Sequence, residues 1–301
     1  MNTQKRVLVI GSANADYLIR TDRMPALGET LTGSEFTINA GGKGLNQAVA
    51  LAKLGADTAF LGAVGDDEGG RMLLTTLDEH GVGFEGFVTA DTPTGVALVT
   101  VVGSDNFILL SAGANACLTP AAIQEKAALI HAADFVVLQL EIPVETVETI
   151  CAIAKQSGTR VVLNPAPYKE LPPAVYAEVD YLIPNEHEAE DITGIAPDTQ
   201  ESATEAVERL RALGADTVII TLGERGCVYN DGDETVFAPA VKSEAVDTTS
   251  AGDSFIGALV SRLAQDAPLP DAVAYAARVA AITVSRRGAA RSIPYANEVE
   301  E

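Results

Sequence analysis

Short runs of β-branched and other apolar residues alternate with longer helix-type patterns through most of the chain. Such alternation is typical of repeated β-α-β units, which form a parallel sheet with helices on both faces. We therefore expect an α/β fold with a doubly wound, mostly parallel central sheet, built as a single domain over residues 1–301. The predicted strands are 6–10, 58–63, 135–140, 160–163, 181–183 and 217–221. The predicted helices are 44–54, 69–80, 120–131, 144–156, 203–213, 251–264 and 271–286.

Two stretches, about 15–40 and 94–111, interrupt this alternation. Each contains strand-like runs separated by turn residues, and neither contains a convincing amphipathic helix. We expect the two stretches to form one small β-sheet over the carboxyl ends of the parallel strands, where ligands bind in open α/β folds. A sheet in that position would act as a lid.

The two stretches carry more apolar side chains than one buried face of a small sheet requires. A second covered face would follow if the lid paired two copies of the chain, so we expect a homodimer through the lid. The alternative is that these side chains cap the core of a monomer. The residues concerned are Leu31, Phe36, Ile38, Val96, Leu98 and Val99.

The formal net charge of −22 opposes broad electrostatic attraction to nucleic acid or to an anionic membrane surface. We predict neither partner, and any anionic ligand must be held by local groups. The first apolar run, 7–10, is far shorter than a signal-peptide core or a membrane span. The three cysteines lie far apart without Cys-x-x-Cys spacing, which favours reduced thiols. These features predict a cytoplasmic protein.

The segment 247–255, Asp-Thr-Thr-Ser-Ala-Gly-Asp-Ser-Phe, places small residues ahead of a helical run. A helix that begins near Ala251 would direct the amides of Ala251 and Gly252 and its positive dipole end toward a phosphate, as an anion hole. Asp253 would lie in the first turn, where an isolated carboxylate would serve only to stabilise the helix dipole. Beside an anion hole it could accept the proton of an attacking hydroxyl. We therefore predict Asp253 as the general base of a phosphoryl transfer.

The segment 41–47, Gly-Gly-Lys-Gly-Leu-Asn-Gln, lies where an extended run enters a helix. It combines a flexible backbone with ammonium and amide donors, which suits a polyol ligand. It is not a Walker A loop, because Lys43 is followed by Gly44 and the earlier glycine position is Thr37.

A third segment, 11–16, has the sequence Gly-Ser-Ala-Asn-Ala-Asp and follows the first predicted strand directly. It lacks the Gly-x-Gly-x-x-Gly spacing of dinucleotide-binding turns. Asp16 could accept hydrogen bonds from two adjacent sugar hydroxyls, and Asn14 could both donate and accept. The simpler interpretation of these residues is an Asx-type turn.

These three segments, in their order and separations, resemble the ribokinase branch of the carbohydrate kinase family often called the PfkB family. The similarity spans nearly the whole chain, and two family signatures are present, at 41–47 and at 247–255. The resemblance implies an enzyme that transfers the γ-phosphate of ATP to the 5-hydroxyl of D-ribose, with Mg²⁺ and a monovalent cation, usually K⁺, as cofactors.

The resemblance also implies a set of site residues. The catalytic group would be Asp253 with the anion-hole residues Gly252 and Ala251. The sugar would be held, together with Asp253, by Asn14, Asp16, Gly42, Lys43, Asn46 and Glu141. ATP would contact Asn185, Thr221, Gly223, Gly226, Gly252 and Ala277. Magnesium would be organised, usually through water, by Asn185 and Glu188. The monovalent cation would be bound by Asp247, Thr249, Thr283, Arg286, Gly288 and Ser292.

The chain departs from many relatives at Ser250, where they have Gly, at Leu45, where they have Ala, and at Ala277, where they have a polar residue near adenine. A serine would stiffen the anion-hole turn, and Ala277 would weaken selection of the base. Neither change removes a catalytic group.

Several alternatives stay open at this point. A kinase for deoxyribose, fructose or a ribonucleoside would share Asp253 and the anion hole and differ only in its sugar contacts. A sugar-binding regulator could keep the fold without turnover, since a fold alone never establishes activity. A nicotinamide-dependent oxidoreductase is disfavoured by the glycine spacing of the first turn.

Overall fold

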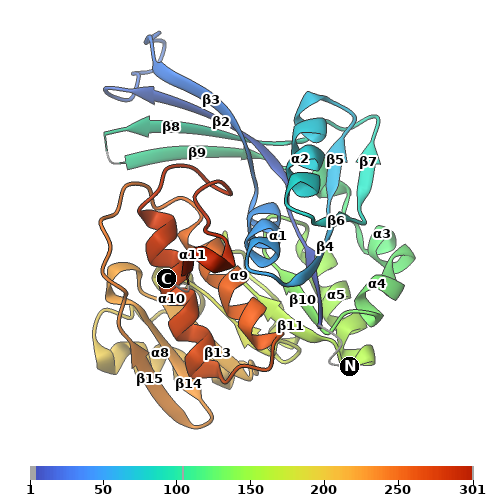
Figure 1. Cartoon of the computed structure of the whole chain (residues 1–301), viewed down its shortest axis with the longest axis vertical. Coiled ribbons are helices and arrows are strands. Elements are labelled where there is room, and N and C mark those ends of the chain that lie inside the picture. The colour runs from blue at the N-terminus through green and yellow to red at the C-terminus, as the bar shows by residue number, and fades with distance from the viewer. Residues whose placement is uncertain (1–4, 104, 300–301) are drawn as a thin grey trace.

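The computed structural model describes residues 5–103 and 105–299. The ends of the predicted domain, 1–4 and 300–301, and position 104 of the predicted small sheet lie outside the described residues. The architecture is a large central sheet with helices on both faces and a small sheet that projects from one end of the body (Figure 1).

The central sheet has nine strands, in the order β15-β14-β13-β12-β11-β10-β1-β4-β6. All neighbours from β13 to β6 run parallel, and only β14 and β15 are added antiparallel. The predicted doubly wound, mostly parallel sheet is therefore confirmed. The strands are β1 (Arg6–Ile10), β4 (Asp57–Leu61), β6 (Gly83–Phe84), β10 (Phe135–Leu138), β11 (Arg160–Leu163), β12 (Tyr181–Leu182), β13 (Thr217–Thr221), β14 (Cys227–Asp231) and β15 (Glu234–Ala238).

The helices cover the two faces of this sheet because successive side chains of its strands point in opposite directions. Leu8 and Ile10 of β1 belong to one buried apolar cluster, and Val7 and Val9 belong to the other. The first cluster is covered by α3 (Pro120–Glu125), α4 (Ala127–His131), α5 (Val144–Ser157), α6 (Pro173–Tyr176), α7 (Glu186–Thr193) and α8 (Gln200–Ala212). The second is covered by α1 (Lys43–Lys53), α2 (Glu68–Glu79), α9 (Ala251–Leu263), α10 (Leu269–Val284) and α11 (Ala296–Val299).

The small sheet has four strands in the order β3-β2-β8-β9. They are β2 (Asn14–Thr21), β3 (Ser34–Gly41), β8 (Gly95–Val102) and β9 (Asp105–Ser111). Strands β2 and β8 pair in parallel, whereas β3 and β9 pair antiparallel at the two edges. Two hairpins that are far apart in sequence thus join side by side, and both leave the body at the same end (Figure 1).

The structure divides two of the predicted elements. The predicted strand 58–63 becomes β4 of the central sheet and, beyond Gly62, β5 (Ala63–Gly65), which pairs instead with β7 (Phe87–Thr89). The predicted helix 120–131 is broken at Lys126, whose φ of −107° and ψ of 9° end α3. No Gly or Pro marks this break, so periodicity alone did not reveal it. Within the described part of the chain, no helix has the length and apolar character needed to cross a membrane.

Candidate active site

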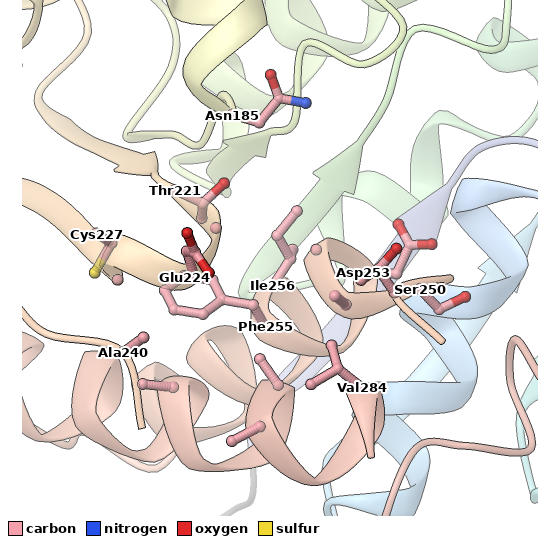
Figure 2. A pocket seen from close by; sticks show the side chains of 18 of the residues that line it. Asn185, Thr221, Glu224, Cys227, Ala240, Ser250, Asp253, Phe255, Ile256 and Val284 are labelled. Atoms are coloured by element: carbon pink, nitrogen blue, oxygen red, sulfur yellow. The ribbon is translucent and has the colours of Figure 1, made fainter. Parts of the chain in front are cut away.

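A cavity of about 930 Å³ lies between the carboxyl ends of the central strands and the helices α9 and α10. Figure 2 shows Asp253 and Ser250 on one side of this cavity and Cys227 and Ala240 on the opposite side. Lys43 and Glu188 also line it. All six residues predicted to contact the nucleotide are brought together in its wall: Asn185, Thr221, Gly223, Gly226, Gly252 and Ala277.

Helix α9 begins at this cavity in a left-handed turn. Ser250, its N-cap residue, has φ 61° and ψ 14°, a conformation that residues other than glycine adopt at a cost. The amide of Ala251, predicted as part of the anion hole, instead donates to the carbonyl oxygen of Thr248 at 3.2 Å. The next two amides, of Gly252 and Asp253, lie in the first helical turn, where an α-helix has no carbonyl of its own to pair with them. This turn therefore has the geometry of an anion site.

Open space lies in front of Gly252. A Cβ atom built on this residue would meet no heavy atom within 4 Å, apart from its chain neighbours and the backbone of its own helix. The side of the first turn that faces the cavity is therefore free of protein at this point. A phosphate group has room to approach the amides there.

Asp253 is buried and accepts hydrogen bonds from two side chains. Asn46 Nδ2 donates to Oδ2 at 3.1 Å, and Gln47 Nε2 donates to Oδ1 at 3.0 Å. Burial raises the pKa of Asp253, although the charge of Lys43 and the two donated hydrogen bonds oppose this rise. A carboxylate with a raised pKa is a better proton acceptor than an ordinary Asp, which suits a general base.

Gln47 is oriented by a buried chain of amides that sequence reasoning missed. Its Oε1 accepts a hydrogen bond from Gln139 Nε2 at 2.7 Å, and its Nε2 also donates to Asn164 Oδ1 at 3.3 Å. Asn164 Nδ2 in turn donates to the backbone oxygen of Ile183 at 2.9 Å. Because a backbone oxygen can only accept, this contact fixes the orientation of Asn164, and Gln47 must present its NH₂ group to Asp253.

The predicted sugar residues gather on the other side of Asp253, around the start of α1. Gly42 has φ 93°, and a Cβ there would lie 2.9 Å from the Ala13 Cα and from the Asn14 nitrogen. Glycine is thus required for the segment 41–47 to pack against the segment 11–16. Asn46 on α1 and Asp16 on β2 each have one buried side-chain oxygen, Oδ1, without a hydrogen-bond partner. Buried acceptors without partners indicate a missing donor.

Glu141 joins the two segments. Its Oε2 accepts hydrogen bonds from Ser12 Oγ at 2.5 Å, from Asn14 Nδ2 at 3.3 Å and from the Lys43 amide at 3.2 Å. This places the carboxylate between the first turn of the sheet and the start of α1. The sequence alone could not distinguish this position from that of an ordinary acid at a helix start.

The charges in this pocket strongly affect each other. Burial raises the pKa of Asp16 to about 7, and the nearby carboxylates of Glu141 and Asp253 add to the rise. Burial alone would lower the pKa of Lys43, but the charges of Asp253, Glu141 and Glu188 outweigh it and raise that pKa. Lys43 therefore stays a cation and lies between the predicted sugar residues and the cavity, whose wall it also lines.

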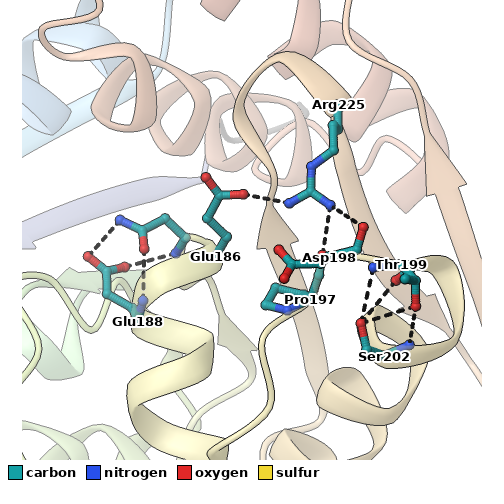
Figure 3. Close-up of polar contacts among 8 residues, drawn as sticks. Glu186, Glu188, Pro197, Asp198, Thr199, Ser202 and Arg225 are labelled. Carbon is teal, nitrogen blue, oxygen red and sulfur yellow. Dashed lines mark hydrogen bonds and ion pairs between the residues drawn. The ribbon is translucent and has the colours of Figure 1, made fainter.

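Asn185 and Glu188 form a capping box at the start of α7. Asn185 Oδ1 accepts from the Glu188 amide at 2.8 Å, and Glu188 Oε2 accepts from the Asn185 amide at 2.9 Å (Figure 3). Burial raises the pKa of Glu188. Within residues 5–103 and 105–299, no group of three or more His, Cys, Asp or Glu side chains could hold a metal ion. A magnesium ion here would need most of its ligands from water and phosphate, which is its usual behaviour beside a nucleotide.

The turn 223–226 is connected to α7 by a hydrogen bond of Arg225. Arg225 Nη2 donates to Glu186 Oε2 at 2.6 Å, and Nη1 donates to the backbone oxygens of Pro197 and Asp198 at 2.8 and 3.0 Å (Figure 3). One guanidinium group thus connects the turn that carries Gly223 and Gly226 to the helix that carries Asn185. Sequence reasoning did not single out Arg225.

The residues predicted for the monovalent cation lie around the loop before α9 and the end of α10. Asp247 Oδ1 accepts from the Thr249 amide at 2.9 Å and Oδ2 from the Gly288 amide at 3.0 Å. Partial burial would raise the pKa of Asp247, but these hydrogen bonds outweigh it and lower that pKa. An ionised carboxylate close to the carbonyl end of α10 provides the negative field that a cation requires. Other side chains here bond within the protein: Thr283 to Val279, Ser292 to Ala289, and Arg286 to Glu298.

The sequence is similar to known carbohydrate kinases along nearly its whole length. The pfkB family carbohydrate kinase pattern matches residues 4–296. A ribokinase from Schizosaccharomyces pombe is 41% identical over 306 residues, covering 98% of this chain and 96% of the relative. A deoxyribokinase from Salmonella typhimurium is 37% identical over 298 residues, covering 98% and 97%.

A solved structure of Arabidopsis thaliana ribokinase complexed with ribose and ATP is similar along the whole chain. Its TM-score is 0.93 at 30% identity, and the match covers 99% of this chain and 98% of that one. The family match, the curated relatives and the shared fold agree with one another, so this chain belongs to the pfkB family of carbohydrate kinases and is a sugar kinase, a phosphotransferase that acts on an alcohol group.

Proposed function

We propose that this protein phosphorylates D-ribose at its 5-hydroxyl, using ATP. The observation that carries the proposal is the pair of buried acceptors, Asp16 Oδ1 and Asn46 Oδ1, that have no partner and lie beside the buried carboxylate of Asp253. A ligand rich in hydroxyl groups would satisfy both acceptors and bring one hydroxyl to the base. The similarity to the Arabidopsis ribokinase, whose structure contains ribose and ATP, supports the same ligands here.

In the proposed reaction, Asp253 accepts the proton of the 5-hydroxyl as the sugar oxygen forms a bond to the γ-phosphorus. The bond from that phosphorus to the β,γ-bridging oxygen breaks, and ADP leaves. The amides of Gly252 and Asp253 stabilise the negative charge on the transferred group through the positive end of α9. Lys43 adds a positive charge between the two substrates.

Magnesium and potassium belong to this proposal, as does a cytoplasmic location. Glu188 and Asn185 would organise the magnesium through water, which would supply charge neutralisation on the phosphates. Asp247 and the carbonyl end of α10 would hold the monovalent cation, close to the turn in which α9 begins. Titration with each ion in the presence of the nucleotide tests both assignments.

Ribose has a close competitor in 2-deoxyribose. The deoxyribokinase from Salmonella typhimurium is 37% identical, so overall identity does not decide between the two sugars. The arrangement of Asp16 and Asn14 favours a vicinal diol, because an acceptor left unpaired by a missing hydroxyl lowers affinity. Fructose, ribonucleosides and a regulator without turnover are the further alternatives.

We also propose that the small sheet acts as a lid and joins two copies of the chain. Asp16 and Tyr17 are consecutive residues of β2 and therefore point to opposite faces of this sheet. The cross-strand row Ile38, Tyr17, Leu98 and Leu109 shares the face away from Asp16, and its members Ile38, Leu98 and Leu109 are 46 to 56% exposed. Such an exposed apolar face is typical of an interface. Sedimentation of the wild type and of Leu98→Asp tests the proposed dimer.

The function itself is tested by ADP release with Mg-ATP and a panel of ribose, 2-deoxyribose, fructose and ribonucleosides, with and without potassium. Asp253→Asn is the control variant, because it should keep sugar and ATP binding while turnover falls sharply. Ribose-dependent release that is lost in this variant supports the proposal. Preference for another sugar would overturn the substrate assignment, and the absence of ADP release with every sugar tested would favour the regulator.

A further inference from the structure

We propose that Asn115 is a positioning residue that holds the side-chain amide of Asn14 in one orientation, with its NH₂ group turned toward the sugar. The proposal deepens the proposed ribose kinase activity and rests on it. Asn115 is buried and lies in the short 3₁₀ helix Gly113–Cys117, directly after the last strand of the small sheet. It belongs to none of the motifs that the sequence singles out.

The orientation follows from a backbone amide, which can only donate. The amide of Ala13 donates to Asn115 Oδ1 at 3.0 Å, so the other arm of the Asn115 side chain must be its NH₂ group. That group donates to Asn14 Oδ1 at 2.8 Å. The remaining arm of Asn14 is therefore its own NH₂ group, which donates to Glu141 Oε2 at 3.3 Å. The orientation of each side-chain amide therefore follows from the hydrogen bond described before it.

Rotation of either amide would be costly. If Asn14 turned over, its oxygen would face the carboxylate of Glu141 and its NH₂ group would face the NH₂ group of Asn115. Both contacts would be repulsive inside a site that is largely shielded from water. Asn14 and Asn115 are 4% and 1% exposed, so water does not offer either group a ready replacement partner.

Glycine at position 95 makes the close approach of the two amides possible. A Cβ at Gly95 would lie 2.3 Å from Asn115 Nδ2 and 2.4 Å from Asn14 Oδ1. Asn14 is the first residue of β2, and Gly95 is the first residue of β8 and its register partner. The Asn115 contact therefore lies where the two inner strands of the small sheet leave the body.

A fixed donor at Asn14 has a chemical consequence for the ligand. A group bound there must accept a hydrogen bond from the amide, and the adjacent carboxylates of Asp16 and Glu141 require a donor. A hydroxyl group meets both demands at once, whereas a hydrogen atom at the same carbon meets neither. Asn115 thus contributes to selection for a hydroxylated carbon through Asn14, and not by contact with the sugar.

The variant Asn115→Asp tests the proposal. Its carboxylate can still accept from the Ala13 amide, but its second oxygen would accept from Asn14 and turn that side chain over. We expect the KM for ribose to rise roughly tenfold to a hundredfold, the range expected when one hydrogen bond is lost and an acceptor is left unpaired. The kcat at saturating ribose and the KM for ATP should change by less than about twofold.

Asn230→Asp is the matched control. Asn230 on β14 is also buried, its Oδ1 accepts from the Val218 amide at 2.7 Å, and its Nδ2 donates to the backbone oxygens of Asp216 and Gly232, outside the site. It should lower stability in the same way as Asn115→Asp and leave the KM for ribose unchanged. Equal effects of the two variants on that KM would mean that only general destabilisation was measured, which would overturn the proposal.

A double-mutant cycle with Asn14→Leu separates positioning from a structural role. If Asn115 acts through Asn14, then Asn115→Asp should change the KM for ribose by less than about twofold in the Asn14→Leu background. A full additional loss in that background would refute the proposal, because it would show that Asn115 acts by another route.

A measurement on the sugar-free protein tests the inference independently of the activity. The side-chain amide NMR signals of Asn14, identified by their loss in Asn14→Leu, should move in Asn115→Asp, and those of Asn164 should stay. Unchanged Asn14 signals would overturn the inference. Failure of the wild type to phosphorylate any sugar would instead count against the proposed function and leave this result standing.

Discussion

Gln47 Nε2 donates a hydrogen bond to Asp253 Oδ1 over 3.0 Å, while its neighbour Asn46 donates to the other oxygen of the same carboxylate over 3.1 Å. Two consecutive residues of α1 thus hold one carboxylate at the start of α9. The base of the proposed reaction is oriented by the protein itself, before any substrate contributes a contact.

Replacing Gln47 by Met should slow turnover and shift its pH dependence. The variant keeps the volume but removes a donor to the charged form of Asp253, so the pKa of that group rises further. We expect kcat to fall roughly tenfold and its acidic limb to move to higher pH, with smaller changes in both KM values. Measurement of kcat against pH checks this, with Gln124→Met on the exposed side of α3 as control. An unshifted acidic limb would contradict the assigned role.

Ribose binding should weaken below neutral pH. Burial, Glu141 and Asp253 raise the pKa of Asp16 to about 7, so this group is largely protonated at pH 6 and cannot accept two sugar hydroxyls. A single proton with that pKa predicts a KM for ribose about tenfold higher at pH 6 than at pH 8. In Asp16→Asn the KM should be high at both pH values. A KM for ribose that is flat from pH 6 to pH 8 in the wild type would exclude this account.

The ionised side chain of Asp16 should lower the stability of the sugar-free protein. Its pKa is about 7 when folded and near the ordinary value of 3.8 when unfolded, so the folded state binds more protons between these values. The contribution of Asp16 to stability is therefore present below pH 4 and is lost as the pH rises to 7. Asp16→Asn should raise the Tm more at pH 8 than at pH 4, a difference that thermal unfolding at the two pH values measures directly.

Gly252→Ala should give a more stable and less active protein. The added Cβ meets no heavy atom within 4 Å, and alanine is favoured over glycine in a helix by about 1 kcal/mol. The methyl group would, however, occupy the space in front of the first turn of α9. We expect kcat/KM for ATP to fall roughly tenfold while the Tm stays or rises. Gly83→Ala, where a Cβ also meets open space, is the control and should leave the kinetics unchanged.

Arg225→Met should loosen the turn 223–226, which is proposed to contact ATP. The variant removes the bond to Glu186 and the bonds to two backbone oxygens, so the turn 223–226 is no longer fastened to α7. Because Arg225 is partly exposed, the loss of stability should stay below about 1 kcal/mol. We expect the KM for ATP to rise about threefold to tenfold and the KM for ribose to stay constant. Arg211→Met, which breaks an exposed ion pair elsewhere, serves as the reference variant.

The class of fold could be predicted from the sequence because the six predicted strands of the central sheet are short apolar runs that need no distant information. The same holds for the segments 11–16, 41–47 and 247–255, whose residue types already point to their chemistry. The hairpin β14–β15 was missed, because Cys227–Asp231 shows weak alternation and Glu234–Ala238 is partly exposed. Its strands are recognised only once β14 pairs with β13 and β15 pairs with β14.

The supporting residues of the site could not be predicted, because their partners lie far away in the sequence. Gln139 is 92 positions from Gln47, and Asn115 is 101 positions from Asn14. A buried amide carries no pattern that distinguishes it from a surface amide until the fold places its partner. The capping box of Asn185 and Glu188 is different, because an Asn followed three residues later by Glu before a helix is a local signal.

Asn14, the proposed sugar contact, is also the first residue of β2, so the segment that would bind the ligand continues directly into a strand of the proposed lid. An eight-residue strand spans about 26 Å, and a rotation of about 5° at its base would move its tip about 2 Å. In the proposed lid, the ligand contact would lie at the base of β2, and the far end of the sheet would move farther than the contact itself. The ligand would need no intermediate element to move the sheet, because a shift of Asn14 would act directly on the strand to which this residue belongs.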